Sequence, residues 1–230
     1  MPGRDIAAST VARATAGCGV VAIAALLVLC APASSAVLVA PYGVPPGMKA
    51  APSPGELGPE QAPIPPAPAL APAASPGLGK SVDGITCEQH EQAIFHIHAH
   101  LTLFVSGKAR QVPYGIGIGP PLSLQNTAVG PFVGGGNCFS WLHTHAADGI
   151  IHIESPVQRT FTLGNFFDLW RQALSSSQVG PAHGRVTAFV NGVVYTGNPR
   201  QIPLRSHAQI QLDVGTPLIA QRRITFLGGL

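Results

Sequence analysis

Six of the nine histidines in this 230-residue chain lie between positions 96 and 152. They are His96, His98, His100, His143, His145 and His152. The spacing of two within each run matches a β-strand, because residues two apart on a strand share a face. The first three imidazoles are therefore expected on one side of a strand. Neutral imidazole is the commonest metal ligand in proteins, so the pattern predicts a metal site.

The second group of histidines falls in a predicted hairpin. The Asp-Gly pair at positions 148–149 favours a two-residue type I′ turn, since both central positions of that turn need positive φ. This turn would place His145 opposite His152, whereas a four-residue loop would place His143 opposite His152. Both registers put the three histidines and Glu154 on one face, and only an odd loop length would separate them.

The donor types limit which metal such a site could take. Imidazole-rich sites suit Cu(II), Zn(II), Ni(II) or Fe(II), and the affinity order favours copper over zinc at equilibrium. The only methionine after position 1 is Met48, which argues against a soft Cu(I) site. We therefore expect a divalent transition metal ion, with copper or zinc favoured and nickel or iron as alternatives, bound by the six histidines.

Glu154 is the one carboxylate expected on the histidine face. Three histidines and an open coordination position also make up the ligand set of a catalytic zinc, whose bound water is the nucleophile. Glu154 could then be a fourth ligand, a partner that orients an imidazole, or a general base. A solvent-facing position at a sheet edge is the alternative, and no other catalytic candidate is assigned.

The first 80 residues differ in composition from the rest. Residues 1–40 include Arg4 and Arg13 and then an uncharged run at 18–40, which is typical of a signal peptide or a transmembrane signal anchor. Residues 41–80 are rich in proline, alanine and glycine, and we expect a disordered linker. The protein is predicted to be exported: on the extracytoplasmic face of the membrane if the leader stays, secreted or periplasmic if it is cleaved.

Residues 81–230 are long enough for a single domain with a core. Charged residues make up 10% of the chain and the net charge is +3, with no basic run suited to nucleic acid. Cys87 and Cys138 are the only cysteines of this region, one ahead of each histidine run. In an oxidising compartment we expect them to form a disulfide; the alternative is that they are thiolate ligands.

The elements that must position these residues are mostly strands. They are expected at residues 94–105, 109–118, both arms of 141–154, 185–190, 193–196, 208–214 and 218–226. Asn191-Gly192 is expected to form a type I′ hairpin turn between two of them. A long loop is expected at 119–136. Thr162 can cap one helix from Leu163 to about Leu174. We therefore predict an α+β fold, with a mainly antiparallel β-sheet, barrel-like or β-grasp-like, and one amphipathic helix packed on its apolar face.

Four blocks of the chain carry a resemblance. They are VDGITCEQHEQAIFHIHAHLTLFVSGK, VPYGIGIG, CFSWLHTHAADGIIHIESP and FTLGNFFDLW. They resemble an uncharacterised family of exported bacterial proteins rich in histidine, with HIHAHL and LHTHxxxGIIHIE-like blocks after a signal or anchor segment. The resemblance covers residues 81–215 and implies export and a shared histidine site, without a known reaction. Ala146 departs from the pattern, in which we expect an acidic residue.

Three hypotheses follow. The first is an exported, membrane-tethered protein that binds a divalent transition metal for sequestration, sensing or delivery. The second is a metal-dependent enzyme that activates a bound water or substrate with help from Glu154. The third is a metal-free interaction module. We favour binding over catalysis, because no residue pattern beyond the histidines indicates a reaction.

Overall fold

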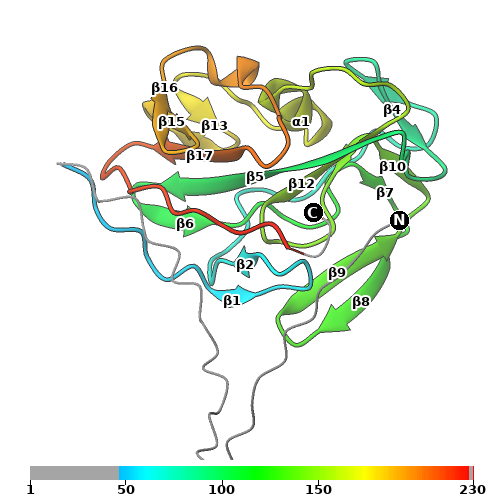
Figure 1. Ribbon diagram of the computed structural model, residues 1–230, viewed down its shortest axis with the longest axis horizontal. Coiled ribbons are helices and arrows are strands. Elements are labelled where there is room, and N and C mark those ends of the chain that lie inside the picture. The colour runs from blue at the N-terminus through cyan, green and yellow to red at the C-terminus, as the bar shows by residue number, and fades with distance from the viewer. Residues whose placement is uncertain (1–46, 228–229) are drawn as a thin grey trace, which may run out of the picture. The chain divides into compact units, whose positions relative to one another are not determined.

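The computed structural model describes residues 47–227 and Leu230 (Figure 1). The expected leader, residues 1–40, lies outside the described residues, as do the first six positions of the expected linker. Within the described part, no helix is long and apolar enough to cross a membrane.

Strands dominate the described residues. The strands up to the first histidine run are β1 (Glu56–Leu57), β2 (Pro63–Ile64), β3 (Ser81–Val82), β4 (Ile85–Glu88) and β5 (Phe95–Val105). Next come β6 (Lys108–Arg110), β7 (Ile118–Gly119), β8 (Ser123–Thr127), β9 (Gly130–Gly135), β10 (Cys138–Ser140), β11 (Leu142–His143) and β12 (Ile150–Ser155). After helix α1 (Leu163–Leu169) follow β13 (Gln178–Val179), β14 (Ala182–His183), β15 (Val186–Val190), β16 (Val193–Tyr195), the 3-10 helix η1 (Pro199–Gln201) and β17 (Gln209–Val214). The α+β prediction is confirmed.

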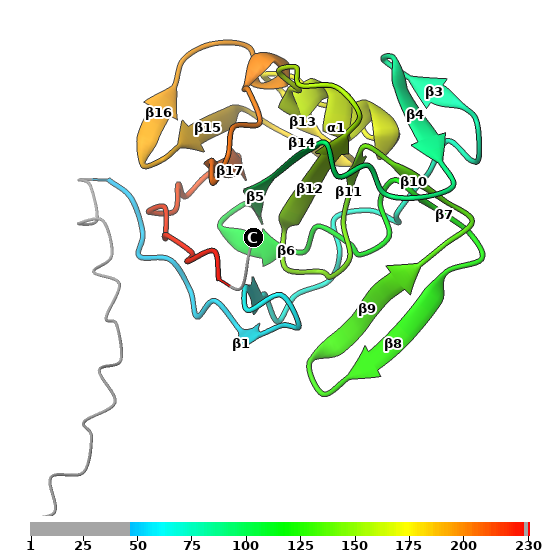
Figure 2. The ribbon, with the colours of Figure 1, turned by 45° about the vertical axis from the view of Figure 1, so that its right-hand side comes forward.

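The main sheet is organised around β5. Its strand order is β11-β12-β5-β17-β15-β16, and β6 also pairs with β5. The first half of β5 pairs antiparallel with β12 and its second half pairs parallel with β17. The sheet is open, with β11 and β16 at its edges, so the barrel-like alternative is wrong. A smaller sheet, β3-β4-β10-β7, lies at one end (Figure 2).

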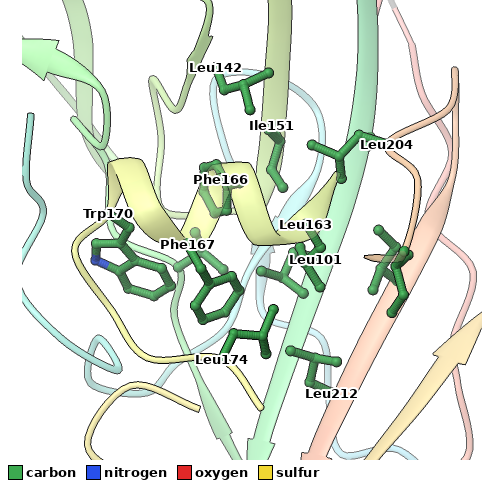
Figure 3. Packing of buried hydrophobic residues seen from close by; sticks show 14 of the residues in the cluster. Leu101, Leu142, Ile151, Leu163, Phe166, Phe167, Trp170, Leu174, Leu204 and Leu212 are labelled. Atoms are coloured by element: carbon green, nitrogen blue, oxygen red, sulfur yellow. The ribbon is translucent and has the colours of Figure 1, made fainter. Parts of the chain in front are cut away.

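The apolar face of the sheet packs against α1 (Figure 3). Alternation along β5 directs Ala99 and Leu101 to this face, and both are buried. Phe166, Phe167 and Trp170 cover them from the helix side, and all three rings are fully buried. The other face of the same strand is left for the histidines, so one strand serves both the core and the candidate site.

The helix begins where predicted and ends earlier. Thr162 is the N-cap, and its hydroxyl accepts a hydrogen bond from the backbone of Asn165 at 3.3 Å. The prediction of a helix to about Leu174 is wrong, because α1 ends at Leu169. Arg171 has a φ of 56°, a left-handed conformation that an α-helix cannot continue through.

The expectation of a disordered linker is wrong for residues 47–80. This segment forms the β1-β2 hairpin, which lies on the side of the main sheet opposite α1, and then continues to the core (Figures 1 and 2). Leu70 is buried in the core, and the indole N–H of Trp170 donates to the carbonyl of Pro72 at 2.8 Å. A proline-rich segment cannot form a core of its own. Because proline has no backbone N–H, the segment needs few hydrogen-bond partners and can pack against the surface of a sheet that is already formed.

Three further segments differ from expectation. Residues 109–118 form no continuous strand: β6 ends at Arg110 and β7 begins at Ile118, and between them Gly115 and Gly117 take positive φ values and turn the chain. The expected loop at 119–136 contains the β8-β9 hairpin, while 218–226 form no strand. The hairpin at Asn191-Gly192 is as predicted, with φ of 52° and 87°.

Candidate metal centre

The strand register places three histidines in a row across the sheet. His98 pairs with His152, and His152 pairs with His143 on its other side. The two-residue Asp148-Gly149 turn is therefore wrong, and the register is the one that we associated with a longer loop. Asp148 instead fixes that loop, because its side chain accepts a hydrogen bond from the backbone of Ile150 at 3.0 Å. The histidines and Glu154 still share one face of the sheet, because the predicted and observed registers differ by an even number of residues.

Four donor atoms from β5 and β12 form a closed ring, which we call the β5-β12 cluster. His96 Nε2 lies 3.0 Å from His98 Nε2 and 3.1 Å from Glu154 Oε1. His152 Nδ1 lies 3.1 Å from His98 Nε2 and 3.2 Å from Glu154 Oε1. Hence the first histidine run and the hairpin meet at one place. Tetrahedral zinc with bonds of about 2.0–2.1 Å holds its ligand atoms about 3.3 Å apart, so the ring has the size of a metal site.

Hydrogen bonds alone cannot satisfy the β5-β12 cluster. A ring N–H points at one acceptor, and a protonated ring nitrogen has no lone pair with which to accept. With three ring nitrogens and one carboxylate, at most two of the four contacts can be hydrogen bonds. A cation in the centre would satisfy all four donor atoms together. Three of the four residues are buried, and only His96 is substantially exposed.

A second group of donors, the β11 cluster, consists of His143, His145 and Glu91. The two ring Nε2 atoms lie 3.1 Å apart, and Glu91 Oε1 is 3.4 Å from that of His145 and 3.8 Å from that of His143. The Nδ1 atoms bind backbone carbonyls, of Ser140 for His143 and of Val133 for His145. A carbonyl only accepts, so each Nδ1 carries a proton, and in the neutral form of each ring Nε2 presents a lone pair.

His100 stands apart from both clusters. Its Nε2–H donates to the carbonyl of Asp148 at 2.9 Å, and Thr102 lies near its Nδ1. None of the convergent donor groups in the described residues includes His100. The sequence pattern grouped His100 with the ligands because it shares a face of the strand with His96 and His98. In the structure, that face continues along β5 past the candidate site, and His100 lies outside the site. In the structure, His100 holds the loop that precedes β12.

Two carboxylates near the histidines escaped the sequence analysis. Glu60, from the segment expected to be a linker, accepts a hydrogen bond from His152 Nε2 at 2.6 Å, and its side chain is 6% exposed. Glu91, just ahead of β5, faces the β11 cluster. Their only signal was that acidic residues are scarce, ten in 230. Glu60 in particular follows no local pattern, since its partner is 92 positions away.

Burial and the carboxylates set the charges of the ring nitrogens. Burial lowers the pKa of His98 to about 3 and that of His143 well below its usual range, and neighbouring histidines add to both shifts. Burial alone would also lower the pKa of His152, but its hydrogen bonds to Glu154 and Glu60 raise it to about 9. Neutral imidazoles are the ones that bind metals, so His98 and His143 are in the form that binds a cation, whereas His152 must release a proton to do so.

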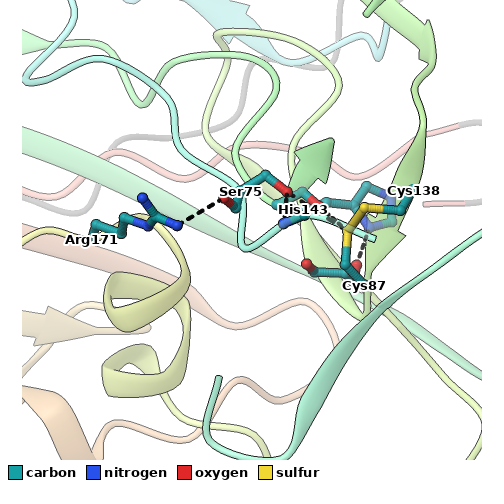
Figure 4. The surroundings of a disulfide bond; sticks show 8 residues. Ser75, Cys87, Cys138, His143 and Arg171 are labelled. Atoms are coloured by element: carbon teal, nitrogen blue, oxygen red, sulfur yellow. Dashed lines mark hydrogen bonds between the residues drawn. A yellow bond between two sulfur atoms is a disulfide. The ribbon is translucent and has the colours of Figure 1, made fainter. Parts of the chain in front are cut away.

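The disulfide predicted between Cys87 and Cys138 is present and joins β4 to β10 (Figure 4). It therefore connects the chain just ahead of each histidine run. His143 lies beside it in the figure, and the carbonyl of Ser75 accepts a hydrogen bond at 3.3 Å from Arg171, just after the end of α1. The cysteines are paired with each other, so the thiolate-ligand alternative is wrong.

A polar cleft opens beside the β11 cluster. Its lining residues are Gln89, His90, Glu91, Gly134, Gly135, Gly136, Asn137 and Phe139. Glu91 is 43% exposed at its side chain and is the member of the β11 cluster that reaches this cleft. The clusters are buried, yet each has one exposed donor, Glu91 in the second and His96 in the first. An ion could therefore enter either cluster from solvent.

Taken together, these buried groups of histidine and glutamate could hold a metal ion. Searches against protein-family models, curated proteins and solved structures find no match to this chain.

Proposed function

We propose that this protein binds a divalent transition metal ion in the β5-β12 cluster. The observation that carries the proposal is the ring of four contacts of 3.0–3.2 Å among three imidazoles and Glu154. A protonated network leaves at least two of these contacts unsatisfied, whereas one cation satisfies them all. Three imidazoles and a carboxylate suit Zn(II) and Cu(II).

The outer partner of His152 supports the same proposal. Metal-bound histidines commonly donate their other N–H to a carboxylate, which fixes the ring and makes the ligating nitrogen more basic. His152 has this arrangement, with Nδ1 in the cluster and Nε2 bound to Glu60. The role of the bound ion would be sequestration, sensing or delivery.

The proposed location is outside the cytoplasm. The uncharged run at residues 18–40 and the resemblance to exported proteins motivate it. The Cys87–Cys138 disulfide supports it, because such bonds persist in oxidising compartments. A tether through an uncleaved leader would keep the domain at the membrane surface.

A metal-dependent enzyme is the second candidate. The polar cleft at Glu91 favours it, since a small substrate or water could reach the donors from there. Glu154 would then be a ligand in the β5-β12 cluster, so it would not be available as a free general base.

Metal content tests the proposed function. The full-length chain, the His98→Ala variant and a His183→Ala control would be purified and analysed by elemental mass spectrometry, before and after titration with Zn(II) and Cu(II). His183 is exposed on β14 and belongs to none of the convergent donor groups among the described residues. We expect the variant to bind at least one equivalent less than the control. A wild-type protein that neither retains nor takes up metal would contradict the proposal and leave a metal-free interaction module.

A further inference from the structure

We propose that the protein holds two cations, the second in the β11 cluster, with Glu154 as a ligand shared between them. This inference rests on the proposed function and extends it from one ion to a dinuclear centre.

The first argument concerns the facing nitrogens of His143 and His145. Both rings are buried, and both have Nδ1 bound to a backbone carbonyl, so in their neutral forms both present an Nε2 lone pair. These atoms lie 3.1 Å apart. Two lone pairs at this distance repel each other unless something positive lies between them. A metal ion bound to both nitrogens removes the repulsion and keeps both backbone hydrogen bonds.

The second argument concerns the remaining ligands of that ion. Glu91 approaches both ring nitrogens, and Glu91, His143 and Glu154 offer oxygen and nitrogen atoms that all lie within 4.8 Å of one another. Together with His145 they supply four donors. Four is the usual number for zinc, and a mixed nitrogen and oxygen set also suits Fe(II) or Co(II).

The third argument is that one ion cannot use all of these residues. The two clusters and the shared carboxylate comprise seven donor residues, His96, His98, His152, Glu154, His143, His145 and Glu91. A tetrahedral ion takes four. None of the convergent groups among the described residues contains both His96 and Glu91, one from each exposed end of the site. Two ions divide the donors into sets of four with one residue in common.

The fourth argument identifies the shared ligand. His152 also lies close to both clusters, and its ring stacks on that of His143 at 5.2 Å. However, its Nε2 is already bound to Glu60, which leaves only Nδ1, and Nδ1 faces His98 and Glu154. Both residues belong to a donor group on each side, but Glu154 has two oxygens to offer, whereas His152 has one nitrogen left. A bridging carboxylate therefore fits the geometry better than a bridging imidazole.

The proposed centre is of the two-metal class in which a pair of nearby ions can bind an oxyanion or activate water between them. The second ion would lie next to the polar cleft, because Glu91 is both its ligand and a residue of the cleft wall. That ion would consequently exchange with solvent more readily than the first.

The test is the stoichiometry of Zn(II) binding by the metal-free, full-length chain. We expect two equivalents for the wild type and one for His145→Ala. Glu91→Gln should weaken only the second equivalent, by at least about tenfold, comparable to the loss of an orienting partner or ligand. Glu56→Gln, a change of an exposed glutamate on β1, is the matched control and should bind like the wild type.

A separate variant tests whether Glu154 is the shared ligand. Glu154→Gln should weaken both equivalents, whereas a residue that serves only the first ion would leave the second unchanged. Circular dichroism checks that each variant is folded, and the exposed position of Glu91 keeps the test valid if His145→Ala does not fold. A single equivalent in the wild type, unaffected by Glu91→Gln, would overturn the dinuclear centre and leave the proposed function standing. No binding at all would contradict both.

Discussion

His152 Nε2 donates to Glu60 Oε1 at 2.6 Å, although 92 positions separate the two residues. The contact brings a carboxylate from a proline-rich segment to the back of an imidazole whose other nitrogen faces the β5-β12 cluster. Glu60 also has a buried second oxygen, Oε2, without a hydrogen-bond partner among the described residues. The residue thus joins the N-terminal segment to the site.

Glu60→Gln should weaken binding of the first ion by about 10- to 100-fold without changing the stoichiometry. The amide can still accept the hydrogen bond, but it lacks the charge that makes the ring of His152 a stronger ligand. Competition with a coloured chelator would measure the affinity. Glu56→Gln is again the control, and equal affinities for the two variants would rule out an orienting role for Glu60.

Metal should stabilise the folded domain, because the clusters exist only when β5, β11 and β12 are in register. A free ion concentration 100 times the dissociation constant is expected to add about 2.7 kcal/mol to the free energy of unfolding. Denaturant titration with Zn(II) and with a chelator would measure this difference. His98→Ala should lose the contribution of the first ion, while an equal gain in His98→Ala and wild type would place the ion elsewhere.

The metal-free protein should lose stability in acid, in part through His100. Burial lowers the pKa of His100 to about 4, so the folded state binds fewer protons than the unfolded state between about pH 4 and 6.5. Stability present above pH 6.5 is therefore lost as the pH falls. At pH 5 the loss due to this one residue is about 2 kcal/mol.

His100→Gln isolates that term, because the amide can still donate to the carbonyl of Asp148 but does not titrate. The free energy of unfolding at pH 7 and at pH 5 should differ less in the variant than in the wild type, by about 2 kcal/mol. Identical pH dependence in the two proteins would show that His100 is not buried in its neutral form.

Removing the disulfide should cost about 4 kcal/mol of stability, because the bond closes a loop across 51 positions. The Cys87→Ala/Cys138→Ala double variant and the reduced wild type would be unfolded in denaturant beside the oxidised wild type. Agreement between the first two assigns the effect to the covalent bond. A loss in the double variant alone would assign it to the packing of the two side chains.

The sequence predicted those parts of the site that depend on local periodicity. His96 and His98 share a face because a strand alternates, and Glu154 stays on that face for any even loop length. Thr162 and the Asn191-Gly192 pair were recognisable because a cap and a tight turn have short-range chemical requirements. The disulfide followed from counting, since only two cysteines remained after the leader.

The parts that failed depend on contacts distant in sequence. Proline-rich composition gave no reason to place Glu60 on His152, because that packing requires the sheet to exist first. The separation of His100 from the ligands depends on where Asp148 lies, and the sequence pattern suggested a shorter turn there. The early end of α1 depends on the left-handed backbone of Arg171, and no glycine next to it in the sequence indicates that the helix ends there.

Alternation on β5 has a consequence for how this chain can change. Ala99 lies between His98 and His100 in sequence, but its side chain is buried against the helix side. A substitution that enlarges it would shift the strand and thereby alter the spacing of imidazoles that it never touches. Evolution of the hydrophobic interior and tuning of the proposed cation affinity are therefore coupled along a single strand, and a mutational screen confined to histidines and glutamates would miss positions such as Ala99.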